Sequence, residues 1–129
     1  MSKIKGTVSE LKIALWYINK GWQVYLPVDQ NTPVDMVVIR EWESLKIQVK
    51  TIYQDGHRLR ANIDHNGSAK YSKREVDIMA CVYNNKTWII PMADISNETT
   101  LNFGREDGGI SITRGNFDHT KYYKGELNA

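Results

Sequence analysis

The fold predicted for this chain is decided by the stretch Pro33-Val-Asp-Met-Val-Val-Ile-Arg-Glu-Trp-Glu-Ser-Leu-Lys-Ile-Gln-Val-Lys-Thr51. Two apolar arms, rich in β-branched residues, flank a polar bend at residues 40–44. This pattern predicts a β-hairpin that turns around Trp42. Such pairing places Asp35 across from the Val49–Lys50 end of the second arm.

Side chains on a strand point alternately to its two faces, which sorts the second arm into two sets. Gln48 and Lys50 share one face, while Ile47, Val49 and Thr51 point to the other. An acid, an amide oxygen and a lysine amine are therefore expected to converge at one end of a small sheet.

The segment before the hairpin is predicted to form an amphipathic helix over Ser2–Lys20. Its apolar residues recur at alternating spacings of four and three, and we expect them to face the core: Ile4, Val8, Leu11, Leu15 and Ile18. Gly21 is expected to end the helix as its C′ residue. Glu10 lies on the flank of this stripe.

The remaining elements are expected to be short. A helical turn is predicted near Tyr71–Arg74 and another at Met92–Ile95, and the expected strands are residues 22–27, 58–63, 76–83, 87–91, 100–103 and 110–113. A helix followed mainly by strands predicts an α/β domain built on one mixed sheet, with the helix on one face. Residues 116–129 are polar, and the pattern leaves open whether they dock or stay disordered.

Length and composition narrow the class of protein. A chain of 129 residues is expected to form one domain, with a core at about residues 4–103 and a C-terminal extension at 104–129. Cys81 is the only cysteine, which excludes an internal disulfide and favours a reducing cytoplasm. No apolar run is long enough to span a membrane, and no signal-peptide pattern opens the chain.

The polar groups of the hairpin suit one chemistry, the metal-assisted hydrolysis of a phosphodiester. Mg²⁺ prefers oxygen ligands, and Asp35, the side chain of Gln48 and the backbone carbonyl of Val49 supply them. Lys50 can orient the attacking water or stabilise the phosphorane, and Glu10 can complete the metal shell. These residue types recur by chance, but Gln48 and Lys50 interrupt an otherwise apolar strand, where a buried charge needs a partner.

Basic residues outnumber acidic ones in two segments, although the formal net charge of the whole chain is only +2. The first is the N-terminal helix. In the second, around residues 56–75, we expect the DNA contacts to be Arg58, Arg60, Lys70, Tyr71, Lys73 and Arg74. A solvated loop is the alternative interpretation of this segment.

Several blocks, in this order, resemble the core of PD-(D/E)XK nucleases. They are Ser9-Glu10, Gly21-Trp-Gln-Val-Tyr-Leu-Pro27, Val34-Asp-Met-Val-Val38 and Ile47-Gln-Val-Lys-Thr51. The Gln-Val-Lys form, with Tyr71, Val76-Asp-Ile78 and Trp88-Ile-Ile-Pro91, is similar to group I intron-encoded homing endonucleases. The resemblance covers roughly residues 4–103.

This resemblance implies a restriction-endonuclease-like α/β fold with the N-terminal helix packed on a mixed central sheet. It implies Glu10, Asp35 and Lys50 as catalytic residues and Gln48 in the shell of Mg²⁺, with Mn²⁺ as a substitute. It also implies cleavage of double-stranded DNA by a homodimer or homotetramer in an intracellular, bacterial or phage-like setting.

Gln48 departs from the Asp or Glu that the wider superfamily carries, although it fits the homing branch. The neutral amide leaves one negative charge fewer for the metal. An inert DNA-binding module on a nuclease scaffold therefore stays open. A structure-specific nuclease of the Holliday-junction resolvase kind is the other alternative, because such enzymes also resemble small, dimeric PD-(D/E)XK proteins with a helix glutamate.

Overall fold

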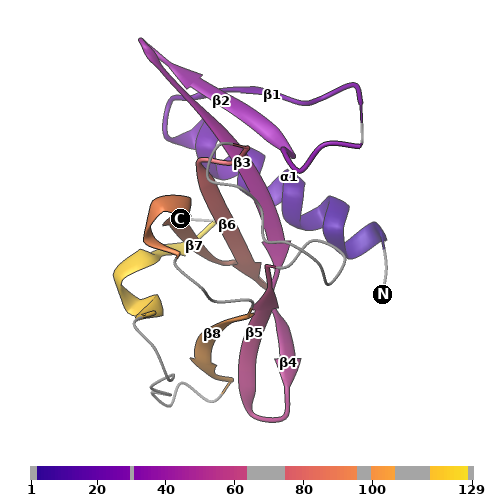
Figure 1. Cartoon of the computed structure of the whole chain (residues 1–129), viewed down its shortest axis with the longest axis vertical. Coiled ribbons are helices and arrows are strands. Elements are labelled where there is room, and N and C mark those ends of the chain that lie inside the picture. The colour runs from indigo at the N-terminus through magenta and orange to yellow at the C-terminus, as the bar shows by residue number, and fades with distance from the viewer. Residues whose placement is uncertain (1–2, 30, 64–74, 96–99, 107–116, 128–129) are drawn as a thin grey trace.

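The computed structural model describes residues 3–29, 31–63, 75–95, 100–106 and 117–127. Its long helix and its largest sheet form the frame (Figure 1). The elements in chain order are α1 (Lys3–Asn19), β1 (Gln23–Tyr25), β2 (Met36–Arg40), β3 (Glu43–Thr51), β4 (Tyr53–Asp55), β5 (Arg58–Asn62), β6 (Ile78–Tyr83), β7 (Lys86–Pro91), the 3₁₀ turn η1 (Met92–Asp94), β8 (Thr100–Arg105), the 3₁₀ turn η2 (His119–Tyr122) and β9 (Tyr123–Glu126). The predicted α/β class is confirmed.

The predicted hairpin forms from β2 and β3. Met36 pairs with Ile47 and Arg40 with Glu43, so Glu41 and Trp42 make a two-residue turn. Glu41 takes a positive φ of 56°, as such tight turns require, and Trp42 is fully exposed at the tip. The register places Asp35 opposite Gln48, one residue earlier on β3 than the pattern predicts.

The large sheet is mixed and has the order β1-β2-β3-β6-β7-β9. Among the described strands its one parallel pair is β3 with β6, in which Gln48 aligns with Met79 and Lys50 with Cys81. β6 is buried along almost its whole length because both faces of the sheet are covered, which explains its continuous apolar sequence.

The expectation of a single sheet is wrong, because β4, β5 and β8 form a separate three-stranded sheet. This small sheet continues from the end of β3 (Figure 1). Only Ile52 separates β3 from β4, and its N–H bonds to the carbonyl of Val82 on β6. The chain therefore leaves the large sheet at Ile52.

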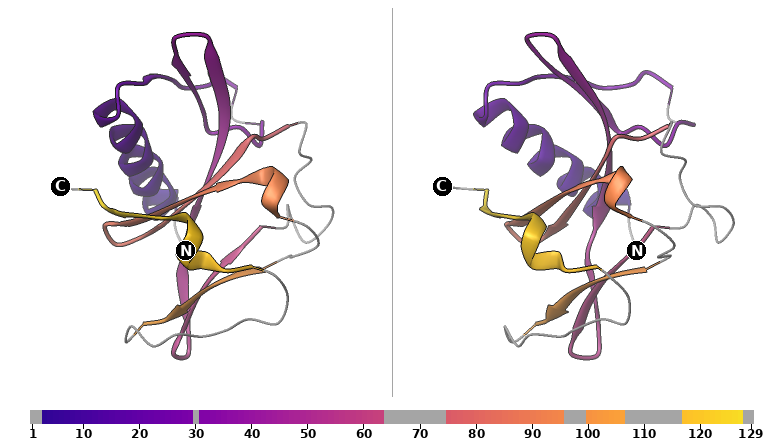
Figure 2. Two further views of the ribbon diagram at one scale, coloured as in Figure 1. Left: turned by 90° about the vertical axis from the view of Figure 1, so that its left-hand side faces the viewer. Right: turned by 60° about the vertical axis from the view of Figure 1, so that its left-hand side comes forward.

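The core has two parts, one on each face of the large sheet. On one side α1 packs over Met36, Val38 and Ile47 (Figure 2). On the other, the side chains between the two sheets include Met79, Cys81, Trp88, Ile90, Leu101 and Phe103. Cys81 is fully buried, as free cysteines often are because they pack like small apolar residues.

The helix Lys3–Asn19 lies within one residue of the predicted bounds but does not have the predicted orientation. Its buried side chains are Ser9, Ile13 and Tyr17, while all five residues of the predicted core-facing stripe are between 43% and 74% exposed. Both faces of α1 are apolar, and periodicity alone does not tell which face meets the sheet. The Ser9 hydroxyl lies 2.7 Å from the Thr51 hydroxyl, which ties the buried face to β3.

The helix ends as predicted at Gly21, which has a φ of 94°. Trp22 N–H donates back to the Tyr17 carbonyl at 3.0 Å, a closure that a left-handed C′ residue allows. The predicted helical turn at Met92 is also confirmed, and the predicted strands at 76–83 and 87–91 form as β6 and β7, which pair antiparallel. The predictions at Tyr71–Arg74 and 110–113 lie outside the described residues, and no helix within the described part is long and apolar enough to cross a membrane.

Candidate active site

Asp35 is held at the mouth of the hairpin by β3. Its N–H donates to the Ile47 carbonyl at 2.8 Å, which extends the β2–β3 pairing by one residue. Its carboxylate oxygen Oδ2 accepts from Val49 N–H at 2.7 Å and from Gln48 Nε2 at 2.9 Å. The side chain is therefore fixed against the strand that carries Gln48 and Lys50.

Gln48 is buried, and its amide orientation is set by its neighbours. Nε2 donates to Asp35 Oδ2 and also to the Val49 carbonyl at 3.2 Å, and both of these groups only accept. The oxygen Oε1 is buried and has no hydrogen-bond partner among the described residues. A buried amide oxygen without a partner is costly, and a cation is one group that satisfies it.

Glu10 reaches the same place from α1. It lines a groove of about 450 Å³ together with Gly6, Thr7, Leu26, Pro27, Thr32, Val34 and Asp35. Burial, and then the charge of Asp35, raises the pKa of Glu10 above its ordinary value. Two carboxylates thus face one groove at the start of β2.

Burial also raises the pKa of Asp35, and this effect outweighs the Val49 N–H and the Lys50 charge, which both lower it. Carboxylates that are costly to ionise in this way are a frequent property of metal-binding and catalytic sites. A bound cation would stabilise both ionised carboxylates.

Lys50 lies on the same face of β3 as Gln48 and is partly exposed. Its charge acts on Asp35 and on Cys81, its neighbour on β6. Burial nevertheless raises the pKa of the Cys81 thiol to about 12, so this cysteine is not a reactive nucleophile at neutral pH.

The donor set suits a hard cation. The oxygens at hand are the Asp35 and Glu10 carboxylates, Gln48 Oε1 and the Val49 carbonyl, all of the class that Mg²⁺ prefers. The described residues contain no group of three or more His, Cys, Asp or Glu that could hold a metal, so the amide and backbone oxygens are needed.

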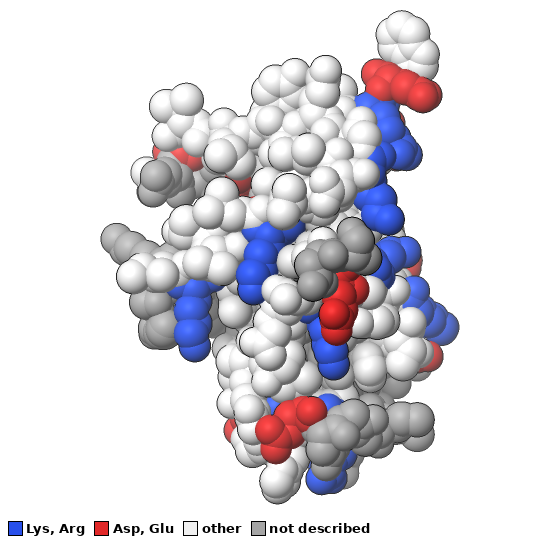
Figure 3. All heavy atoms as spheres, turned by 180° about the vertical axis from the view of Figure 1, so that it is seen from behind, with Lys and Arg blue, Asp and Glu red and all other residues white. Residues whose placement is uncertain are grey.

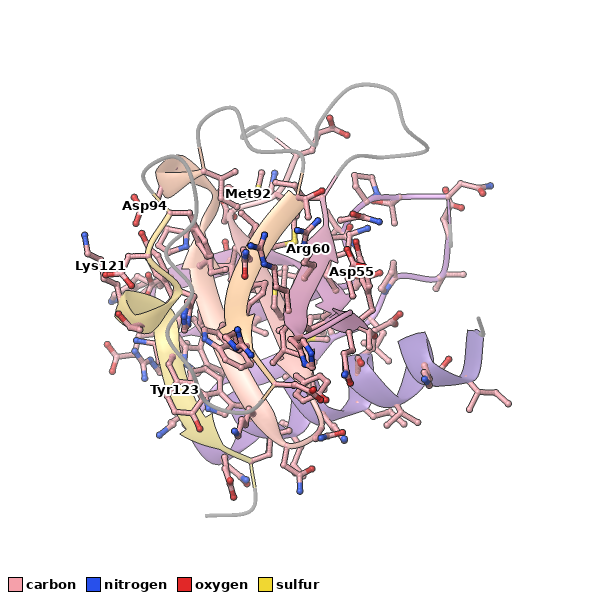
Figure 4. All side chains as sticks on the ribbon, turned by 90° about the horizontal axis from the view of Figure 1, so that it is seen from below. Asp55, Arg60, Met92, Asp94, Lys121 and Tyr123 are labelled. Atoms are coloured by element: carbon pink, nitrogen blue, oxygen red, sulfur yellow. The ribbon has the colours of Figure 1, made fainter. Side chains whose placement is uncertain are left out.

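The predicted DNA contacts divide into two groups. Arg58 and Arg60 lie on β5, in the small sheet, and Arg60 Nη1 is 3.3 Å from Asp55 Oδ2 on β4 (Figure 4). Arg58 is exposed. Lys70, Tyr71, Lys73 and Arg74 lie outside the described residues.

The sequence did not reveal the residues that line the groove or hold its strands in place but have no proposed catalytic role. Thr7, Leu26, Pro27 and Thr32 line the groove, and Asp77 holds β3 by accepting from Lys46 N–H at 2.8 Å. Leu26, Pro27 and Thr32 lie in the segment between β1 and β2, which contains Pro27 and Pro33. These two prolines are the sequence signal that could have indicated a loop at the groove.

The fold is a mixed sheet covered on one face by a helix. It places an acid at the start of one strand, a Gln-x-Lys on the neighbouring strand and a glutamate on the helix. This combination defines a nuclease of the PD-(D/E)XK type. The chain belongs to the PD-(D/E)XK endonuclease family, whose sequence model matches residues 1–106.

Two known proteins are similar to this chain, one in sequence and one in fold. Protein 5.3 of Escherichia phage T7 is 25% identical over 113 residues, which are 84% of this chain and 96% of that protein. The bacterial homing endonuclease I-Ssp6803I has the same fold, with a TM-score of 0.78 at 17% identity over 95% of this chain and 88% of that structure.

Proposed function

We propose that this chain is a divalent-metal-dependent endonuclease that hydrolyses phosphodiester bonds in double-stranded DNA at a specific site. The observation that carries the proposal is Gln48 Oε1, a buried oxygen without a described partner, next to two carboxylates and a lysine. The oxygens can bind a cation, and the lysine can bind the negative charge of a phosphate.

The metal would be held by Asp35, Gln48 Oε1, the Val49 carbonyl and Glu10. When bound, such an ion supplies Lewis-acid polarisation of a phosphoryl oxygen and lowers the pKa of bound water. Mg²⁺ is the expected ion and Mn²⁺ its substitute, because both accept an all-oxygen shell.

The protein's own groups then have separate roles. Asp35 and Glu10 would balance the positive charge of the ion, and a carboxylate in this groove can take a proton from the attacking water. A phosphorane forms when water attacks phosphorus, and the ester oxygen then leaves from it. Lys50 can donate a hydrogen bond to a non-bridging oxygen of this phosphorane and so stabilise its negative charge. Gln48 keeps Asp35 in place through Nε2.

DNA would be held by Arg58 and Arg60 of the small sheet, by the basic segment at residues 70–74, and by Trp42 at the hairpin tip. Trp42 is fully exposed, so a contact with a partner would bury an aromatic side chain that the monomer leaves in water. Cutting both strands of a duplex requires two active sites, and we infer at least a homodimer.

Cleavage of a plasmid library with random inserts, which supplies many possible target sites, tests the proposal. In Mg²⁺ the wild type should cut, while Lys50→Ala and Asp35→Ala should lose at least about 10²-fold in rate, the usual effect of removing a charge-stabilising group. Lys124→Ala on the exposed strand β9 is the matched control and should cut normally. Undiminished cutting by both site variants would falsify the assignment.

A second measurement needs no cleavage. Mg²⁺ should raise the melting temperature of the wild type, because a ligand that binds only the native state stabilises it. The Asp35→Ala variant should show a smaller rise. Tight DNA binding without metal-dependent stabilisation or cutting would instead support an inert module.

The choice of substrate separates the homing and junction alternatives. Ends sequenced from a cleaved library of random DNA should share a motif if the enzyme is site-specific. Cutting of a four-way junction in preference to linear duplex, without a shared motif, would favour a structure-specific nuclease.

A further inference from the structure

The outward face of α1 carries a row of bare apolar side chains. These side chains, which we call the α1 seam, are Ile4, Val8, Leu11, Leu15 and Ile18, and each is at least 43% exposed. They lie opposite the buried face formed by Ser9, Ile13 and Tyr17. Together they present on the order of 500 Å² of apolar surface, within the range of patches that are often functional.

The spacing of the seam is that of a helix–helix interface. Steps of four, three, four and three residues repeat every seven, which is the a/d pattern of a coiled coil. The buried face meets a sheet and follows no such repeat. The periodicity therefore points to a second helix as the occupant of the seam.

Two lysines of α1 are held by contacts outside the seam. Lys12 Nζ donates to the Asn84 carbonyl at 2.7 Å, and Lys20 Nζ lies 5.5 Å from the centroid of the Trp16 ring. Long cationic side chains often shield apolar surface with their stems, but these two are held against the chain's own residues. Figure 3, which looks onto the α1 side, shows a broad uncharged area with Lys and Arg along its margins.

We propose that the α1 seam binds the same seam of a second copy of this chain, with the two helices antiparallel around a two-fold axis. Leu11 is the middle residue of the five and would meet Leu11 of the second copy, while Ile4 would face Ile18 and Val8 would face Leu15. The nearly symmetric spacing around Leu11 makes the surface self-complementary, as a two-fold interface requires.

The area agrees with this occupant. A standard interface buries about 800 Å² on each partner, and homodimer interfaces are about 65% apolar. The apolar area of the seam is close to the apolar part of one side of such an interface, about 65% of about 800 Å². This dimer would supply the two active sites that the proposed function needs to cut both strands. The reason for dimerisation thus rests on the proposed function, whereas the surface and the orientation of the two helices do not.

The mass of the full chain in solution, measured by light scattering without DNA or metal, tests the proposal. The wild type should have twice the monomer mass of 14.9 kDa, and Leu11→Asp should be monomeric with unchanged circular dichroism. Val28→Asp, at a fully exposed apolar residue outside the helix, is the matched control and should stay dimeric. A monomeric wild type, or a dimeric Leu11→Asp, would overturn the proposal.

Cross-linking tests the orientation and does not depend on whether Leu11→Asp folds. In a Cys81→Ala background, Leu11→Cys should form a disulfide-linked dimer on mild oxidation, because the two-fold axis brings the two cysteines together. Ile4→Cys alone should not, whereas the double variant Ile4→Cys, Ile18→Cys should. Failure of Leu11→Cys to cross-link would overturn the antiparallel pairing, and neither measurement is affected if the protein does not cut DNA.

Discussion

Asp35 Oδ2 accepts a hydrogen bond from the backbone N–H of Val49 at 2.7 Å, and this bond joins the start of one strand to the interior of the next. The same oxygen accepts from Gln48 Nε2. One carboxylate oxygen thus satisfies two buried donors on β3, so Asp35 has a structural role in addition to any catalytic one.

The two roles separate in a pair of variants. Asp35→Asn retains an oxygen that can accept both bonds. Asp35→Ala leaves the Val49 N–H without a partner and leaves Gln48 Nε2 with only the Val49 carbonyl, at about 1–3 kcal/mol for each lost bond when the donor stays dry. We expect both variants to lose cleavage and only Asp35→Ala to lose stability in urea unfolding. Equal stability of the two variants would contradict this account of the hydrogen bonds.

Gln48→Glu tests why an amide stands at this position. The variant replaces the Nε2 donor by a second carboxylate beside Asp35 Oδ2, so the lost hydrogen bond and the like charges should lower the melting temperature at pH 7. Mg²⁺ should then raise the melting temperature of Gln48→Glu more than that of the wild type. Gln48→Met, which lacks both the amide oxygen and the amide nitrogen, is the control. Mg²⁺ should raise its melting temperature less than that of the wild type.

The hairpin and its polar groups could be predicted because their determinants are local. β-branched arms, a polar bend and two-residue alternation place Asp35 within one residue of its partner on β3. Gly21 and the turn at Met92 follow from equally local signals.

The errors arise where distant segments decide the outcome. The face of α1 was mistaken because the helix has two apolar faces and only the sheet selects one. The strands β4 and β9 are short and mostly exposed, so they lack the alternation that marks a buried strand. The proximity of Lys50 to Cys81 depends on the parallel pairing of β3 with β6, between segments separated by about 30 residues.

Glu10 gives the wild type a specific pH dependence. A carboxyl group whose pKa is raised on folding binds its proton more tightly in the native than in the unfolded state. Stability therefore falls as the pH rises from the ordinary pKa of 4.5 through the raised value. Glu10→Gln removes this loss, so its melting temperature should match the wild type below pH 4 and exceed it slightly at pH 7.

The measurement is a series of melting curves from about pH 3 to about pH 8 without metal. Adding Mg²⁺ at pH 7 should reverse the order of the two proteins, because the wild type gains a ligand-dependent stabilisation that Glu10→Gln shares only in part. A difference that is the same at every pH would show that Glu10 is not perturbed by its surroundings.

The orientation of α1 predicts which of its residues hold the fold together. Ile13 is fully buried against the sheet, whereas Leu15 belongs to the exposed α1 seam. Ile13→Ala should cost about 2–5 kcal/mol, the usual effect of emptying a core position. Leu15→Ala should cost less than about 1 kcal/mol when measured in protein dilute enough to be monomeric. Urea unfolding monitored by tryptophan fluorescence gives both values, and a larger loss for Leu15→Ala would mean that the helix packs on the sheet through the opposite face.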